Sequence, residues 1–196
     1  LAERLFLNKF WYAIPERLYP RTLAPNSITL FGFFAALSAF IATLVTSPQL
    51  DGSSPVWVSA LVCIMSFVYQ TADGSDGPQA RRLKCGSPLG EIFDHGVDAI
   101  VCTIVFSEAV EVTAVGAGSW VYGAGLLIAQ LAFSFSNLTL LHTGRQFFGE
   151  IDCQEASLTL QACCAFVVAG NLLNAAESTE SFKDPLMFRV PLPLGI

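Results

Sequence analysis

The sequence has little charge, and this shortage excludes an ordinary soluble domain. Charged residues make up 13% of its 196 residues and hydrophobic residues 53%, whereas soluble domains carry about 25% charged residues. Mean hydropathy is correspondingly high, at +0.56. The composition therefore predicts a membrane protein.

Residues that usually bind zinc are scarce or badly spaced. The chain has two histidines and six cysteines, and no cysteine has the spacing of a zinc site. Four of the cysteines lie within apolar runs. We interpret them as small buried side chains. We also recognise no cleavable signal peptide, internal repeat or low-complexity tract in these residues.

Five long apolar runs are present instead, most of them near the roughly 20 residues with which a helix crosses a bilayer. They predict an all-α fold, a polytopic membrane bundle with five transmembrane helices in one domain, 1–196. Residues 1–22 mix aromatic and basic side chains and predict an amphipathic helix at the membrane surface. The runs are Ile28–Thr46, Pro55–Thr71, about Phe93–Val112, Ser119–Leu141 and about Ala156–Leu173.

Serine, asparagine and proline mark the expected helix ends. Asn26 or Ser27 is the expected N-cap of the first span, and Ser87 before Pro88 that of the third. Pro78 lacks an N–H and should kink or restart the second helix.

The stretch at 73–98 sets four aspartates between apolar segments, and packing alone does not explain it. On two successive helices, the spacing turns two carboxylates from each helix toward a common space. One aspartate near the centre of a membrane helix costs about 2.5–3.5 kcal/mol, so a cation has to neutralise the group. The first face carries Asp73, Asp76, Gly77, Ala80 and Arg81, and the second Gly90, Asp94, Asp98 and Cys102.

The expected cations are Mg²⁺ or Mn²⁺, because carboxylates without cysteine favour hard divalent ions. Four aspartates suffice for two ions about 3.5–4 Å apart, which clamp a phosphoryl group. Arg81 supplies a positive fork for phosphate oxygens. A buried ion-pair network needs more basic residues than Arg81, Arg82 and Lys84 provide at that depth. A cation-transport site is the functional alternative.

His95 is the candidate general base. Aspartates that hold a metal ion are poor bases, so a proton acceptor has to come from another side chain. His95 follows Asp94 and precedes Asp98 by three residues, which places it beside the cluster without forcing it to bind metal.

The stretch resembles the CDP-alcohol phosphatidyltransferase family at every fixed position of its motif, D-x2-D-G-x2-A-R-x8-G-x3-D-x3-D. Four longer sequence segments, two of which include parts of the motif, narrow the resemblance to the eukaryotic choline and ethanolamine phosphotransferase branch. They are APNSIT at 24–29, YQTADGSDGPQARR at 69–82, SPLGEIFDHGVDAI at 87–100 and HTGRQFFGEIDCQEAS at 142–157.

The resemblance implies transfer of phosphocholine or phosphoethanolamine from CDP-choline or CDP-ethanolamine to diacylglycerol, with release of CMP. His95 would then deprotonate the lipid hydroxyl, and Glu155 would raise the basicity of that histidine. By the same resemblance Asn26, Gly77, Ala80 and Arg81 would contact the CDP-alcohol, and Asp73, Asp76, Asp94 and Asp98 would hold two metal ions.

Other readings of the sequence stay open at this point. Within the family, the alternative is a CDP-diacylglycerol donor with a small polar alcohol as acceptor; the DHG sequence at 94–96 argues against it. A noncatalytic protein that keeps the fold and a cation transporter are alternatives of other classes. The implied family core has six spans, so we expect the chain to be C-terminally incomplete. We expect no nucleic-acid partner, and a homodimer is left open.

The basic residues predict the orientation. Eight of the ten lie before the first run or in the connections after the second and fourth, which puts the motif on the cytoplasmic side. The expected location is the endoplasmic reticulum or Golgi membrane. Glu108 and Glu111, near the far end of the third run, are expected to emerge at the lumenal interface.

Overall fold

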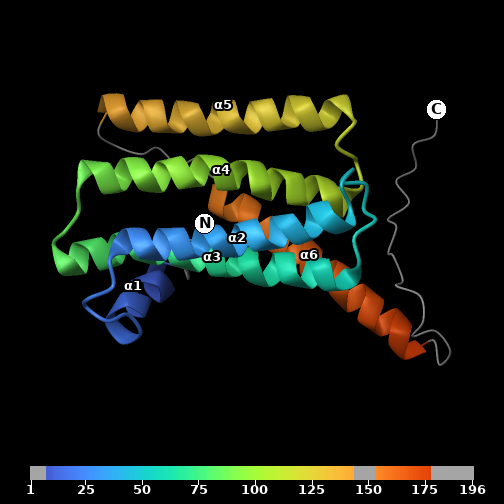
Figure 1. The fold of residues 1–196 in the computed structure, drawn as a ribbon, viewed down its shortest axis with the longest axis horizontal. Coiled ribbons are helices and arrows are strands. Elements are labelled where there is room, and N and C mark those ends of the chain that lie inside the picture. Colours follow the sequence, from blue (N-terminus) through green and yellow to red (C-terminus); the bar gives the residue numbers. More distant parts are fainter. Residues whose placement is uncertain (1–7, 144–152, 178–196) are drawn as a thin grey trace.

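The computed structural model describes residues 8–143 and 153–177, all helical apart from short connections (Figure 1). Side chains are described for 9–140, 142–143 and 157–171. The helices are α1 (Asn8–Arg17), α2 (Pro25–Thr46), α3 (Val56–Leu83), α4 (Pro88–Thr113), α5 (Trp120–Thr143) and α6 (Cys153–Glu177). The predicted all-α class is therefore confirmed for the described residues.

Three of these helices, α2, α3 and α5, are long and apolar enough to cross a membrane. The other two predicted spans fall on α4 and α6. Five acidic residues interrupt the apolar character of α4, and the apolar part of α6 found among the described residues is only Ser157–Asn171. The chain is an integral membrane protein, and the count of five spans stays a prediction.

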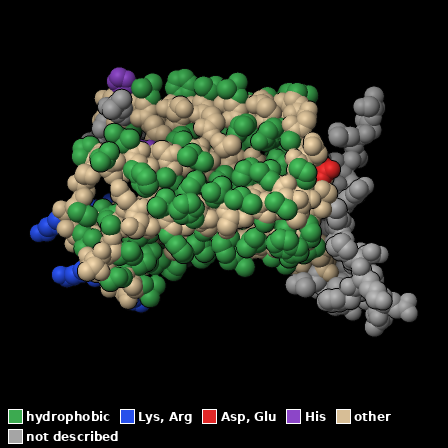
Figure 2. Space-filling view, viewed as in Figure 1, with side chains coloured by type: hydrophobic (Ala, Val, Ile, Leu, Met, Phe, Trp, Pro, Cys, Tyr) green, Lys and Arg blue, Asp and Glu red, His purple; other side chains and the backbone are tan. Residues whose placement is uncertain are grey.

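Helices α2, α3 and α4 lie side by side along the long axis, with α5 outside α4 and α6 crossing behind α3 (Figure 1). The short helix α1 lies at the end where α3 connects to α4. In the space-filling view, apolar side chains cover the flank and the visible lysines and arginines gather at the α1 end (Figure 2). This distribution agrees with a bundle whose flank faces lipid.

Close packing joins the three central helices. A methyl group at Gly32 of α2 would lie 2.7 Å from the Cβ atom of Ala72 of α3, so only glycine permits this approach. Val101 of α4, with 1% of its surface exposed, packs in a cluster with Ala36 of α2. This packing fixes the positions of α3 and α4 next to the motif aspartates.

Of the two expected N-caps, one differs in the structure and the other is confirmed. Helix α2 begins at Pro25 with Ala24 as its N-cap, so Asn26 and Ser27 lie inside the first turn and the predicted cap is wrong. Proline at the first helical position needs no N–H partner, which explains the earlier start. The cap at Ser87 is confirmed, because its Oγ atom accepts a hydrogen bond from the Gly90 N–H at 3.1 Å.

Helix α3 runs unbroken through Pro78, so the predicted restart is wrong. Proline removes one hydrogen bond and strains the preceding turn. Contacts on both sides of Pro78 hold the chain helical here: Trp11 packs on Gly74, and Arg82 donates hydrogen bonds to backbone carbonyls at and after the end of α1.

Glu108 and Glu111 do not emerge at an interface, and that prediction is also wrong. They are 2% and 6% exposed. The carboxylate of Glu108 accepts hydrogen bonds from Thr43 of α2 at 2.9 and 3.1 Å. Helix α2 contacts Glu108, and the turn between α2 and α3 folds over the end of α4 onto Glu111. The sequence of α4 does not reveal this arrangement.

Glu111 fastens that turn to α4. Its carboxylate accepts hydrogen bonds from the Ser47 hydroxyl at 2.7 Å and from the backbone N–H groups of Gly52 at 3.1 Å and Ser54 at 3.0 Å. The charge of this buried carboxylate is thus compensated by three donors.

Replacing Glu111 with glutamine should lower the free energy of unfolding by roughly 1–3 kcal/mol, because an amide cannot accept all three hydrogen bonds. The measurement is the melting temperature in detergent. Glu16→Gln, at an exposed glutamate of α1, is the control and should leave melting unchanged. Equal melting of both variants and the unaltered protein would refute this role for Glu111.

Candidate functional site

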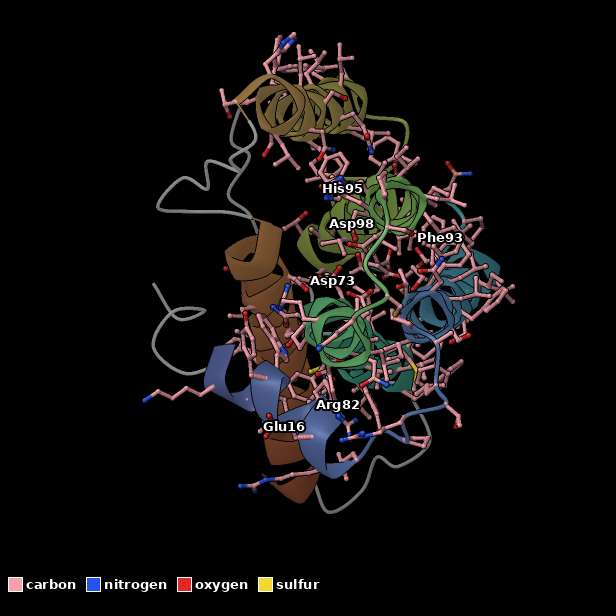
Figure 3. All side chains as sticks on the ribbon, turned by 90° about the vertical axis from the view of Figure 1, so that its left-hand side faces the viewer. Glu16, Asp73, Arg82, Phe93, His95 and Asp98 are labelled. Atoms are coloured by element: carbon pink, nitrogen blue, oxygen red, sulfur yellow. The ribbon has the colours of Figure 1, made fainter. Side chains whose placement is uncertain are left out.

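Three of the four motif aspartates meet between α3 and α4. Asp73, Asp94 and Asp98 each offer a carboxylate oxygen within 4.8 Å of the others. Figure 3 shows Asp73 and Asp98 in the space between the two helices. The structure thus brings together side chains that are up to 25 residues apart in the sequence, as the helical spacing predicts.

Asp76 extends the cluster toward α2. Its carboxyl group lies within hydrogen-bonding reach of Asp94, and its Oδ2 atom accepts a hydrogen bond from the Thr29 hydroxyl at 2.5 Å. With 6% of its surface exposed, Asp76 is buried. Each of the four aspartates therefore adjoins another.

Two hydroxyl groups that the sequence did not single out hold these carboxylates. Thr29 donates to Asp76, and the Tyr69 hydroxyl donates to Asp98 at 2.5 Å. The sequence spacing indicated both residues only weakly. Tyr69 precedes Asp73 by one helical turn, and Thr29 follows Asn26 on the same face of α2. Both are also common spacings for side chains that only pack.

The cluster suits a hard divalent cation. The Oδ1 atom of Asp94 is buried without a hydrogen-bond partner among the described residues. Arg82 donates to the backbone carbonyls of Pro15 and Tyr19 and to the Gln79 side chain, so it does not neutralise the aspartates. Buried carboxylate oxygens of this kind are the ligands of Mg²⁺ and Mn²⁺.

A cavity of about 570 Å³ opens beside Asp76 and Asp94. Its wall comes from the start of α2, the end of α3 and the start of α4. The cavity brings together all four residues predicted to contact substrate, Asn26, Gly77, Ala80 and Arg81, and adds Pro25, Thr29, Lys84, Cys85, Gly86, Ser87, Pro88, Gly90 and Glu91.

Small residues keep that wall open. A methyl group at Gly90 would lie 3.4 Å from the Asn26 Oδ1 atom, and one at Gly77 would lie 3.4 Å from the Arg81 guanidinium. Lys84 ends α3 in a left-handed conformation, with φ of 55°. The polar side chains of the cavity wall include Asn26 and two basic residues, Arg81 and Lys84. Its carboxylates are Asp76, Asp94 and Glu91.

His95 lies on the other side of the carboxylates. It is half-buried and is not among the residues that line the cavity. Figure 3 shows it next to Asp98, on the side of α4 toward α5. The backbone of Glu155 lies in the first turn of α6, but its side chain falls outside the described part of the structure.

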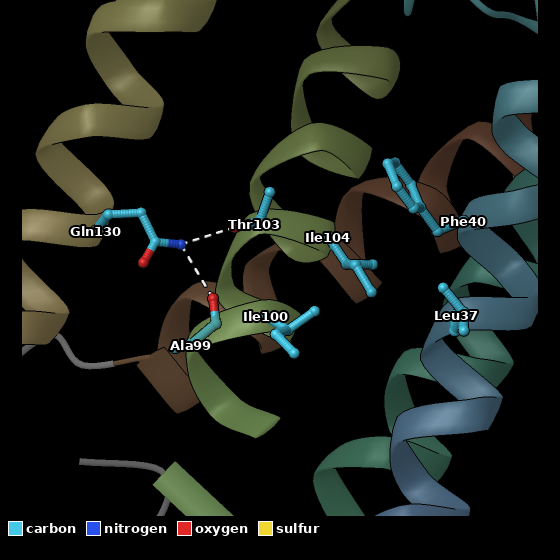
Figure 4. Close-up of a pocket in the computed structure, with 7 residues that line it drawn as sticks. All are labelled: Leu37, Phe40, Ala99, Ile100, Thr103, Ile104 and Gln130. Atoms are coloured by element: carbon cyan, nitrogen blue, oxygen red, sulfur yellow. Dashed lines mark hydrogen bonds between the residues drawn. The ribbon is translucent and has the colours of Figure 1, made fainter. Parts of the chain in front are cut away.

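An apolar groove of about 340 Å³ begins one residue after Asp98, between α2, α4 and α5 (Figure 4). Gln130 of α5 closes one side by donating hydrogen bonds to the Ala99 carbonyl at 3.0 Å and to the Thr103 hydroxyl at 2.7 Å. The groove is lined by Leu37, Phe40, Ala99, Ile100, Thr103, Ile104 and Gln130.

Comparison with known proteins decides the family. Residues 22–180 match the family model described as CDP-alcohol phosphatidyltransferase, and this range contains the aspartates and the cavity. The chain belongs to the CDP-alcohol phosphatidyltransferase family.

Named relatives come from three kingdoms of eukaryotes. Ethanolaminephosphotransferase 1 of Homo sapiens is 31% identical over 189 residues, 93% of this chain and 46% of the human protein. Choline/ethanolaminephosphotransferase 1 of Saccharomyces cerevisiae is 30% identical over 174 residues, 87% of this chain and 43% of that protein. Choline/ethanolaminephosphotransferase 1 of Arabidopsis thaliana is 44% identical over 96 residues, 49% and 24% respectively. The chain thus spans less than half the length of these relatives.

Asp98→Asn should weaken Mn²⁺ binding by more than about tenfold, because the amide loses the charge that a metal ligand supplies. Electron paramagnetic resonance of free Mn²⁺ measures this in the detergent-solubilised protein. Glu108→Gln removes another buried carboxylate of α4 and should leave Mn²⁺ affinity unchanged. Equal weakening of Mn²⁺ binding in both variants, or no weakening in either, would contradict a metal site at Asp73, Asp94 and Asp98.

Proposed function

We propose that the protein transfers phosphocholine or phosphoethanolamine from CDP-choline or CDP-ethanolamine to diacylglycerol, forming phosphatidylcholine or phosphatidylethanolamine and releasing CMP. The observation that carries the proposal is that the cluster of four aspartates, one buried and three half-buried, adjoins a cavity lined by Asn26, Arg81 and Lys84, with Asp76 and Asp94 in its wall. The motif and the named relatives of this branch support the same reaction.

Asp73, Asp76, Asp94 and Asp98 would hold two divalent ions, Mg²⁺ or Mn²⁺. Bound there, the ions supply positive charge to the pyrophosphate and to the phosphoryl group in transfer. Thr29 holds Asp76 and Tyr69 holds Asp98, so two of the four ligands are oriented before substrate arrives.

The donor occupies the cavity of about 570 Å³ in this proposal. The guanidinium of Arg81 binds phosphate oxygens as a two-pronged donor, and the Asn26 amide contacts the CDP-alcohol. Gly77 and Ala80 carry little or no side chain, which lets the donor approach the backbone of α3 beside Asp76.

The acceptor approaches from the other side, where His95 lies. The imidazole accepts the proton of the diacylglycerol hydroxyl while that oxygen attacks the phosphorus atom nearer the choline or ethanolamine. The bond from this phosphorus to the bridging oxygen breaks, and CMP leaves with the bond electrons. Glu155 would raise the basicity of His95. The apolar groove next to Asp98 supports a lipid as one of the two substrates.

The proposed location is the endoplasmic reticulum or Golgi membrane, with the aspartates at the cytoplasmic side. The described lysines and arginines support this orientation, because they belong to α1, the segment that follows it and the end of α3. A homodimer stays a prediction.

The substrates are tested with the full-length protein in phospholipid vesicles that contain diacylglycerol and Mg²⁺. We expect CMP release from CDP-choline or CDP-ethanolamine only when diacylglycerol is present, and competition between the two donors gives the preferred head group. Turnover of CDP-diacylglycerol with inositol or glycerol phosphate, and none with these two donors, would refute the proposed substrates.

His95→Ala should lower turnover by roughly 10²–10⁴-fold, the range for loss of a general base. The KM for CDP-choline should change little, because the donor lies on the other side of the aspartates. His142→Ala is the matched control at the chain's other histidine, exposed at the end of α5, and should retain turnover. Full activity of His95→Ala would exclude His95 as the base.

A further inference from the structure

We propose that Tyr12 of α1 is a positioning residue for Arg81, and that it sets the affinity for the CDP-alcohol donor. This inference rests on the proposed function, since it takes Arg81 to bind the phosphates of that donor. It starts from contacts between α1 and α3 that the family motif does not include.

Tyr12 contacts the Arg81 guanidinium in two ways. Its hydroxyl oxygen accepts a hydrogen bond from Arg81 Nη2 at 3.0 Å, and the guanidinium carbon lies 5.2 Å from the centre of the ring. A phenol supplies both an acceptor and an aromatic face, and the latter attracts a cation. These contacts hold an otherwise exposed arginine in one orientation.

Gly77 also lies next to the Arg81 guanidinium. A methyl group added there would lie 3.4 Å from Arg81 Nη1 and 3.7 Å from Nη2, so the guanidinium lies back over the preceding helical turn. Side chains on a helix point toward its N-terminus, and here that direction leads toward Asp76 and the cavity. Arg81 is therefore held between Gly77 and Tyr12 at the cavity wall.

The neighbour of Tyr12 fixes α1 on α3. The Trp11 side chain is 4% exposed and packs on Gly74, where an added methyl group would lie 2.3 Å from the indole. Any residue larger than glycine at this position would push α1 away. Gly74 occupies a variable position of the motif, so in this chain that position serves to dock α1.

Two further residues of α3 fasten the chain around α1. Gln79, fully buried, donates hydrogen bonds to the backbone carbonyls of Pro20 and Leu23, each at 3.1 Å. Arg82 donates to the carbonyls of Pro15 and, at 2.9 Å, Tyr19. The helix that carries Tyr12 is thus held on α3 at Trp11 and Pro15, and the segment that follows it is held by Gln79 and Arg82.

This arrangement predicts an effect on donor affinity rather than on the chemical step. A free arginine loses side-chain entropy when it binds phosphate, whereas one already held in place loses less. Tyr12 itself is not among the described residues that line the cavity. Removing its hydroxyl should therefore raise KM for the donor and leave kcat nearly unchanged.

The test compares two tyrosines that each tie the α1 region to α3. Tyr12→Phe removes the hydroxyl that contacts Arg81, and Tyr19→Phe removes one that contacts the Ser75 hydroxyl at 3.0 Å. We expect Tyr12→Phe to raise KM for CDP-choline about three- to tenfold, with kcat within about twofold. Tyr12→Leu, which also removes the ring, should raise KM further. Tyr19→Phe should leave this KM unchanged.

A double substitution separates positioning from docking. In an Arg81→Ala background, Tyr12→Phe should have no further effect on KM, because the group that Tyr12 orients is gone. An unchanged KM in both Tyr12 variants would overturn the inference, as would an equal rise in Tyr19→Phe. If the unaltered full-length protein releases no CMP from CDP-choline or CDP-ethanolamine, the proposed function fails first, and the inference fails with it.

Discussion

The structure depends on four buried or half-buried carboxylates that lie close together between two helices of a membrane bundle. Each aspartate is costly in an apolar surrounding, and together they repel one another. The contacts from Thr29 and Tyr69 satisfy some of their oxygens, while one oxygen of Asp94 has no partner in the described part of the chain. A cation bound among them would remove both costs, and this supports the proposal that the cluster is a metal site.

The two sides of the cluster differ in character, and this difference gives the protein its proposed chemistry. On one side a polar cavity with Arg81 and Lys84 suits a nucleotide with two phosphates. On the other, His95 and an apolar groove suit the hydroxyl of a lipid. Helix α1 supports the polar side, because Tyr12 orients Arg81, and the far ends of α2 and α4 are fastened by Glu111.

Much of this site was predictable from the sequence, since helical spacing alone places Asp73 and Asp76 on one face and Asp94 and Asp98 on another. The docking of α1 was not, because Gly74 and Gln79 occupy variable motif positions and contact residues about 60 positions away. The prediction for Glu111 failed for a related reason. Its partners belong to a turn between two other helices, and a pattern within one helix contains no information about them.

The most direct test of a metal site at these carboxylates is melting of the Asp94→Asn variant with and without Mg²⁺. Without Mg²⁺ the variant should melt at a higher temperature than the unaltered protein, because it lacks one of the carboxylate charges that repel one another. With Mg²⁺ the order should reverse, because the cation stabilises only the protein that binds it. If Mg²⁺ does not change the melting of the unaltered protein, and the variant melts lower under both conditions, the carboxylates do not hold a cation.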